Sequence, residues 1–190
     1  MKRANAFLLL LLAACGGAVP PIWQSNAKSA LDSFEQSYLL GDRRAADLEF
    51  DIAGKELAST GDPSLVAQAE LVRCAARTAS LEFDDCPGFL ALRADAGAEE
   101  VAYAEYLAGR AERAAGDDPL SKLVSLGVKL KSGKITPPEI TAAVDIASAQ
   151  GWRRPLLAWL GVQEKRAEAA GDGAALEQIR RRIALVARKD

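Results

Sequence analysis

The sequence predicts an all-α protein made of antiparallel helical hairpins that stack on one another. Three observations favour this fold class. Apolar residues recur at spacings of three and four along most of the chain, which is the period of an amphipathic helix. The composition is rich in Ala, Leu, Glu and Arg and poor in β-branched runs. Gly, Asp-Pro and Gly-Asp repeatedly interrupt the helical stretches. We therefore expect almost no β-strand.

Residues 1–14 have the features of a signal peptide. Basic residues precede an apolar run over residues 7–12, which is too short to cross a bilayer as a helix. The next residues, Leu12-Ala13-Ala14-Cys15, resemble the lipobox of bacterial lipoproteins. This resemblance implies cleavage before Cys15 and a diacylglyceryl thioether on it, so that lipid would anchor the mature chain to a membrane. The alternative is an ordinary secretory signal in which Cys15 has no role.

The residue after the predicted lipidated cysteine is Gly16, whereas retention of bacterial lipoproteins at the inner membrane favours Asp there. We therefore expect the protein on the periplasmic face of the outer membrane, or on the outer face of the plasma membrane if the organism has no outer membrane. Residues 15–24 carry no charge and no helical periodicity, which predicts a lipidated tether. Residues 25–190 should form one all-helical domain.

The apolar period predicts a first helix that ends near Gly41 and a second that ends at Thr60-Gly61, and the short turn between them indicates a hairpin. Asp62-Pro63 and Asp118-Pro119 each combine an N-cap residue with proline at the first helical position. Thr136-Pro137-Pro138-Glu139 has the pattern of a capping box. Eight helices are expected, over about residues 27–40, 44–59, 63–79, 98–115, 119–131, 137–150, 153–170 and 173–188.

The chain has three cysteines, and two of them remain once Cys15 carries lipid. Cys74 lies on the third predicted helix and Cys86 lies in the turn-rich segment after it. In an oxidising compartment we expect a disulfide between them, which would hold this segment against the helix. The alternatives are an unpaired buried Cys74 and a redox pair, and the second lacks the usual Cys-x-x-Cys spacing.

A short segment recurs along the chain. Tyr38-Leu39-Leu40-Gly41 returns as Tyr106-Leu107-Ala108-Gly109 after sixty-eight positions, which is two periods of about 34 residues. With the large and small apolar residues of the first hairpin, this resembles the tetratricopeptide repeat. The resemblance implies a short solenoid with a concave surface that binds other proteins.

The residue types exclude several kinds of chemistry. The chain contains no histidine, which removes the commonest general base and the commonest metal ligand. It also lacks the usual serine-hydrolase, zinc-protease and phosphate-loop motifs. We expect no enzyme activity, no cofactor and no metal. Two adjacent acidic pairs, Asp84-Asp85 and Glu99-Glu100, leave open an alternative function, the binding or cleavage of cell-wall glycan.

The charges are unevenly distributed. Residues 16–117 hold nine basic and eighteen acidic side chains, whereas residues 118–190 hold thirteen basic and eight acidic ones. Such asymmetry can orient a protein against a partner, although a solvated face explains most charge blocks. The basic half is too modest to predict nucleic-acid binding.

Aromatic and basic residues near the carboxyl end form a candidate interaction surface. Trp152 and Trp159 are seven positions apart, which is two helical turns, so we expect them on one helix face. They would serve as rigid anchors beside basic side chains, although aromatics at helical spacing are usually core residues. The candidate residues are Trp152, Arg153, Arg154, Trp159, Arg180, Arg181 and Arg182.

Together these features predict a lipid-anchored, non-enzymatic scaffold that binds other envelope proteins. Secretion, pilus assembly and outer-membrane assembly are the processes in which such a scaffold would act. The glycan-directed alternative would depend on one or two essential carboxylates, whereas a scaffold would show graded losses across a surface.

Overall fold

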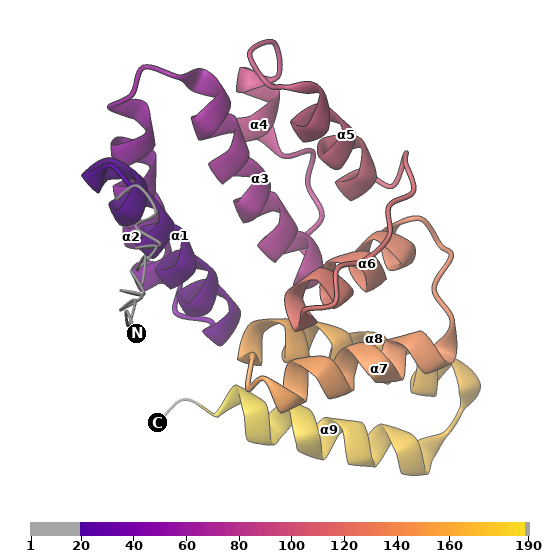
Figure 1. Cartoon of the computed structure of the whole chain (residues 1–190). Helices are drawn as coiled ribbons and strands as arrows, with labels where there is room; N and C mark the ends of the chain where they lie inside the picture. Colours follow the sequence, from indigo (N-terminus) through magenta and orange to yellow (C-terminus); the bar gives the residue numbers. More distant parts are fainter. Residues whose placement is uncertain (1–19, 189–190) are drawn as a thin grey trace, which may run out of the picture.

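The structure is a computed structural model that describes residues 20–188, and the predicted all-α, solenoid-like fold is confirmed across that range (Figure 1). Every regular element between residues 20 and 188 is an α-helix. Within the same range, no helix is both long and apolar enough to cross a membrane. The helices are α1 (Ile22–Leu40), α2 (Arg43–Ala58), α3 (Pro63–Ala79), α4 (Pro87–Leu92), α5 (Ala98–Leu107), α6 (Pro119–Lys131), α7 (Pro137–Ala149), α8 (Arg153–Ala170) and α9 (Gly173–Ala187).

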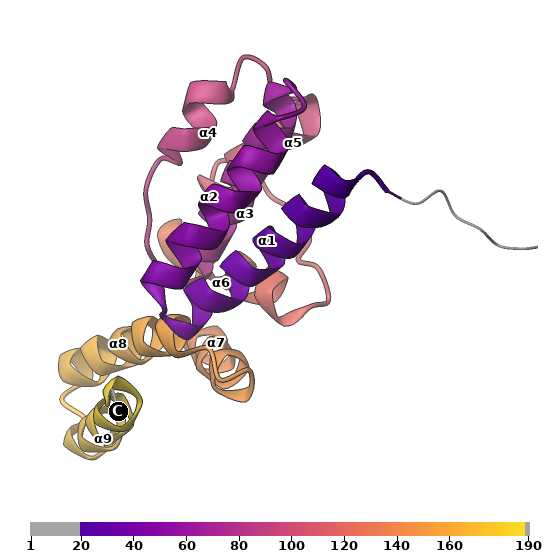
Figure 2. The same ribbon diagram turned by 90° about the vertical axis from the view of Figure 1, so that its left-hand side faces the viewer.

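Helical hairpins form both ends of the described chain. α1 and α2 pack along their length, and Gly41 ends α1 in the left-handed conformation with φ of 89°. At the other end α8 packs against both α7 and α9, and Figure 2 shows these three helices together below the rest of the molecule. The predicted hairpins are therefore present.

The N-terminal signals that the sequence predicts are confirmed. The carboxylate of Asp62 accepts a hydrogen bond from the backbone N–H of Ser64, and that of Asp118 accepts one from Ser121. Glu139 accepts from the backbone N–H and the hydroxyl of Thr136, which completes the capping box. These bonds satisfy N–H groups that a helix leaves free at its start.

α3 is the central helix and contacts α1, α2, α4, α5 and α6. Where it crosses α6, Gly127 of α6 lies against the backbone of Thr78 in α3. A Cβ atom at position 127 would overlap the Thr78 carbonyl oxygen and approach its Cγ2 at 3.1 Å. The two helices can approach this closely because Gly127 has no side chain.

Two apolar clusters form the core. The smaller one lies between α1, α2 and α3, where the rings of Phe34 and Phe50 meet edge to face with centroids 5.1 Å apart. The larger one extends from α3 to α9 and contains the fully buried Phe89 and Trp159. Leu120 and Trp152 contact both clusters, so the core is continuous.

Three boundaries differ from the predictions. α1 begins at Ile22, so residues 22–24, which we expected in the tether, are helical. The short helix α4 occupies part of the segment expected to consist of turns, and its Phe89 is fully buried. α5 ends at Leu107 instead of near residue 115 because Gly109, with φ of 77°, ends it. Residues 20–188 thus contain nine helices, one more than predicted.

The two recurring Tyr-Leu segments are equivalent helix ends. Tyr38 and Tyr106 are both buried, and Gly41 and Gly109 both take the left-handed conformation at the end of α1 and α5. The same pattern therefore produces the same local structure twice: a buried Tyr-Leu pair followed by a glycine that ends the helix.

Candidate functional site

A long groove runs along α1 and α3. A cavity of about 340 Å³ lies beside the amino-terminal half of α1, and a wider one of about 510 Å³ lies between α1, α3, α5 and α6. Glu35, Gln68 and Val72 line both cavities, so the two are continuous. We call this continuous surface the α1–α3 groove.

The floor of the α1–α3 groove is apolar and only partly covered. Its deepest residues, such as Leu71 and Val124, are buried and belong to the core. Others remain partly exposed to solvent: Trp23, Leu31, Leu65, Val72, Tyr103 and Leu120. A contiguous set of half-exposed large apolar side chains is typical of a binding surface.

The walls of the groove are acidic. Its lining includes five carboxylates but only two cations, which are Lys28 and Arg113. Lys28 already pairs with Asp32 at 2.5 Å, and the Arg113 guanidinium lies 5.3 Å from the centre of the Tyr103 ring. The five carboxylates are Asp32, Glu35, Glu99, Glu100 and Asp118.

Glu35 is the least compensated of these carboxylates. It is half-buried where the two cavities meet, and within residues 20–188 its side chain has no hydrogen bond and no ion pair. Burial raises its pKa above the ordinary value of 4.5, and the nearby charges of Asp32 and Asp118 raise it further, while Lys28 partly offsets them. The groove therefore contains a partly desolvated negative charge without a partner.

We expect Glu35→Gln to stabilise the free protein at pH 7. Because the folded-state pKa of Glu35 is raised, the folded chain binds an extra proton just above pH 4.5, so stability falls as pH rises through this window. Glutamine removes that loss. The free energy of unfolding of Glu35→Gln, measured with urea, should therefore rise relative to that of wild type between pH 4 and pH 7. Equal stability differences at both pH values would contradict this account. The other charged groups facing the groove are Lys28, Asp32, Glu99, Glu100, Arg113 and Asp118.

The predicted tryptophan surface is wrong for Trp159. This side chain is fully buried, and its indole N–H donates to the carbonyl oxygen of Ala79 at 3.1 Å. Trp152 is half-buried where the two core clusters meet. Both tryptophans therefore contribute to packing, because the start of α8 packs against α1 and Trp159 reaches the end of α3 at Ala79. The core interpretation of the heptad spacing is the one that the structure supports.

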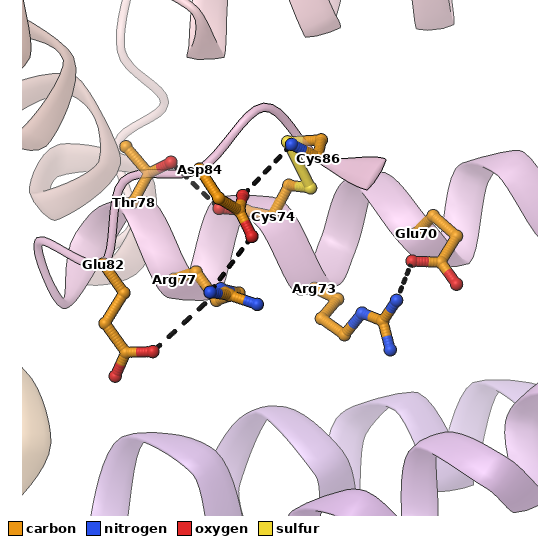
Figure 3. Close-up of a disulfide and its surroundings, with 8 residues drawn as sticks. All are labelled: Glu70, Arg73, Cys74, Arg77, Thr78, Glu82, Asp84 and Cys86. Carbon is orange, nitrogen blue, oxygen red and sulfur yellow. Dashed lines mark hydrogen bonds and ion pairs between the residues drawn. A yellow bond between two sulfur atoms is a disulfide. The ribbon is translucent and has the colours of Figure 1, made fainter. Parts of the chain in front are cut away.

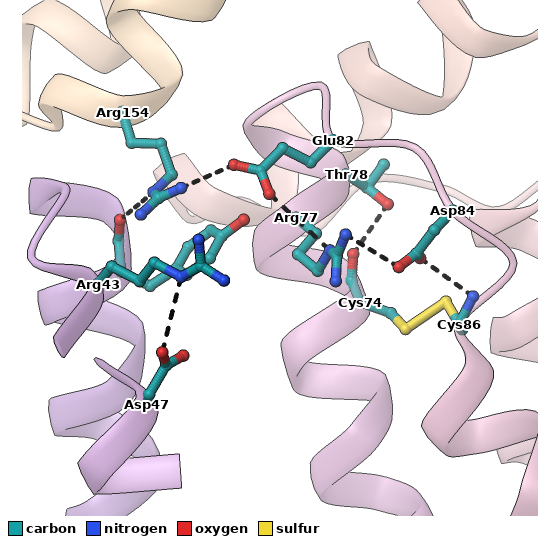
Figure 4. Close-up of polar contacts among 10 residues, drawn as sticks. Arg43, Asp47, Cys74, Arg77, Thr78, Glu82, Asp84, Cys86 and Arg154 are labelled. Carbon is teal, nitrogen blue, oxygen red and sulfur yellow. Dashed lines mark hydrogen bonds and ion pairs between the residues drawn. A yellow bond between two sulfur atoms is a disulfide. The ribbon is translucent and has the colours of Figure 1, made fainter. Parts of the chain in front are cut away.

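Arg154 holds three parts of the chain together (Figure 4). Its Nε donates to the carbonyl oxygen of Tyr38 at 2.8 Å, and its Nη1 lies 2.7 Å from a carboxylate oxygen of Glu82. The guanidinium also lies over the Tyr38 ring, 4.2 Å from its centre. Because it is committed to contacts between α1, α8 and the segment after α3, Arg154 has a structural role. Its neighbour Arg153 lies beside Gly41 and is half-buried.

The three consecutive arginines of α9 do not join this group. Arg180 pairs with Glu164 at 2.8 Å and with Glu168 at 2.6 Å, and Arg181 pairs with Glu177 at 3.5 Å. Glu164 is ten residues beyond Arg154 on α8, a distance of about 15 Å along the helix. Arg182 lies in a separate cavity between α7, α8 and α9. The predicted basic residues therefore occupy separate places and do not form one surface.

The predicted disulfide is present between Cys74 and Cys86, whose Cα atoms are 5.8 Å apart (Figure 3). Asp84 braces the loop between them, because it accepts from the Cys86 N–H at 3.1 Å and pairs with Arg77 at 3.0 Å. Within residues 20–188, Cys74, Asp84 and Cys86 are also the only group spaced for a metal ion, but the disulfide uses both sulfurs. Asp85 lies in a cavity apart from the groove.

Replacing Cys74 and Cys86 together with serine should lower the free energy of unfolding by about 2–3 kcal/mol, because the loop they close gains freedom in the unfolded chain. Urea unfolding of the double variant should match that of reduced wild type. In denaturing, non-reducing conditions, wild type should offer no thiol to an alkylating reagent. Labelling of both thiols would show that the bond does not form.

Sequence reasoning found one wall of the groove and missed the others. Glu99 and Glu100, one of the two adjacent acidic pairs, line it, whereas no sequence pattern predicted Glu35, Asp118 or Tyr103 as site residues. One signal was available for Glu35, since it follows Phe34 and lies close to the buried stripe of α1. The predicted lipidation site, Cys15, lies outside the described residues.

Fold and groove together define a solenoid-like, all-helical protein with an acidic, apolar-floored groove. The chain shows no match to a known protein family, to a curated protein or to a solved structure. Its function must therefore be argued from the site itself.

Proposed function

We propose that this chain is a lipid-anchored envelope protein that acts as a non-enzymatic scaffold and binds a partner protein in the α1–α3 groove. The lipobox-like residues Leu12-Ala13-Ala14-Cys15 support the anchor and, with Gly16, the outer membrane as its location. Secretion, pilus assembly and outer-membrane assembly are the processes that fit such a location.

The observation that carries the binding role is the groove itself. It joins two cavities of about 340 and 510 Å³ and leaves large apolar side chains partly exposed along its floor. Exposing these side chains to water is unfavourable, and a partner that covers them would recover that free energy at about 25 cal/mol per Å² of buried apolar area.

Crosslinked recovery of the intact lipoprotein from its native membrane, compared with an unanchored Cys15→Ser chain, tests this proposal. A partner recovered in near-stoichiometric amount with the anchored protein, and lost when Leu65 in the groove floor is replaced with Asp, would support it. Inhibition of lipoprotein signal peptidase should leave a longer precursor. If the inhibitor leaves the electrophoretic mobility of the protein unchanged, the lipid anchor is contradicted. If Leu65→Asp does not reduce recovery of the partner, binding in the groove is contradicted.

A second function, cleavage or binding of cell-wall glycan, is favoured by one observation. The pKa of Glu35 is raised, in part by the negative charge of Asp118, which lines the same cavity. Glycoside hydrolases commonly use two carboxyl groups in different environments. Purified peptidoglycan incubated with wild type, Glu35→Gln and Asp118→Asn would test it. Release of soluble fragments that both variants abolish would establish an enzyme and overturn the scaffold proposal.

A further inference from the structure

The helices that form the groove restrict how a partner can bind. Along its whole length the groove is lined mainly by side chains of α1, α2, α3, α5 and α6, whose backbone N–H and C=O groups are bonded within each helix. No strand edge exists in residues 20–188 to which an extended peptide could add. Strand addition is therefore excluded here, whereas an amphipathic helix satisfies its own backbone hydrogen bonds and can lay an apolar face into such a groove.

The floor specifies the face that this helix must present. From Trp23 to Glu35 the groove follows α1 over thirteen residues, an axial distance of about 18 Å or roughly three helical turns. The partly exposed Leu31, Leu65 and Val72 lie along this length. An apolar stripe with spacings of three and four would cover them over the same distance.

The walls specify the charge of the bound helix. Glu99 at one wall and Glu35 at the junction have no ion pair within residues 20–188, and the two lining cations are engaged with Asp32 and Tyr103. A cation placed beside Glu35 would relieve a carboxylate that is partly desolvated and has no partner. A negative or neutral helix would bury that charge without compensation.

We propose that the α1–α3 groove binds a cationic amphipathic helix of about three turns supplied by a partner protein, with a Lys or Arg of that helix against Glu35. This inference rests on the proposed scaffold function and names the chemistry of its partner. Apolar burial provides most of the affinity, and the pairing with Glu35 provides selectivity for positive charge.

A synthetic peptide tests the inference directly. A labelled helical peptide of about 14 residues of Leu, Ala and Lys, with Leu at spacings of three and four, is titrated with the protein and followed by fluorescence anisotropy. A scrambled peptide of the same composition and a peptide with Glu in place of Lys are the controls. The cationic amphipathic peptide should bind at least about tenfold more tightly than either, and more weakly as salt is raised.

Two protein variants locate the binding. Glu35→Gln should raise the Kd of the cationic peptide by about tenfold, while Glu49→Gln should leave that Kd unchanged. Glu49 is the matched control because it is a half-buried glutamate of α2 that lies outside the groove and has no ion pair within residues 20–188. Equal binding of the scrambled or Glu peptide, or equal effects of the two variants, would overturn the inference.

A photo-reactive residue at position 65 separates failure of this inference from failure of the scaffold function. In native membranes, a crosslink to an acidic or non-amphipathic segment of a partner would overturn the cationic helix and leave the scaffold standing. Absence of any crosslinked protein, together with an empty recovery from the membrane, would overturn both.

Discussion

Replacing Trp159 with alanine is expected to lower the free energy of unfolding by about 3–5 kcal/mol and the midpoint of thermal unfolding by roughly 10 °C. The indole is fully buried in the larger core cluster, so its removal leaves a cavity among α3, α7 and α8. It also removes the hydrogen bond to the Ala79 carbonyl oxygen. Urea and thermal unfolding followed by circular dichroism measure the loss.

The control for this variant is Leu185→Ala. Leu185 is 69% exposed on α9, so its truncation should change stability by less than about 0.5 kcal/mol. Trp159→Phe should fall between the two variants because it keeps part of the volume and loses the hydrogen bond. If Trp159→Ala cost no more than Leu185→Ala, Trp159 would not be a core residue.

Gly127→Ala should destabilise the protein by about 3 kcal/mol, although alanine is the better helix former. The added methyl group would overlap the backbone of Thr78, which cannot turn away as a flexible side chain could. α3 and α6 would have to separate, which would displace Val124 in the floor of the groove. Chemical unfolding measures the effect on stability.

Gly54→Ala and Gly161→Ala provide the opposite result for comparison. Both glycines lie inside helices, and a Cβ at either position would meet nothing within 4 Å. Each substitution should therefore stabilise the protein by about 0.5–1 kcal/mol. If Gly127→Ala also stabilised the protein, the close crossing of α3 and α6 would be wrong.

Trp159→Ala and Gly127→Ala are expected to affect the groove differently. Trp159 lines neither cavity of the groove, so its loss should reduce stability before it changes the groove. Gly127 sets the approach of α6, which lines the wider cavity through Leu120 and Val124. Gly127→Ala should therefore also weaken binding of the cationic peptide under conditions where the variant is still folded.

The sequence determined the fold class and most helix ends because these depend on local chemistry. Apolar spacing placed α1, α2 and α3, and the Asp-Pro and capping-box signals placed the starts of α3, α6 and α7. The pairing of Cys74 with Cys86 followed from cysteine count and expected compartment. The short α4 was not predicted because six residues are too few to show a helical period, and what holds it is the tertiary burial of its own Phe89.

The position of the site depends on tertiary packing. Glu35, Val72, Tyr103 and Asp118 come from four separate parts of the chain, and no local pattern relates them. Trp159 and Arg154 were candidates for an interaction surface because periodicity places residues on a helix face without showing what that face meets. Packing of α8 against α1, α7 and α9 assigned these two residues to the interior and to an interhelical contact. Packing of α1, α3, α5 and α6 left the acidic groove open.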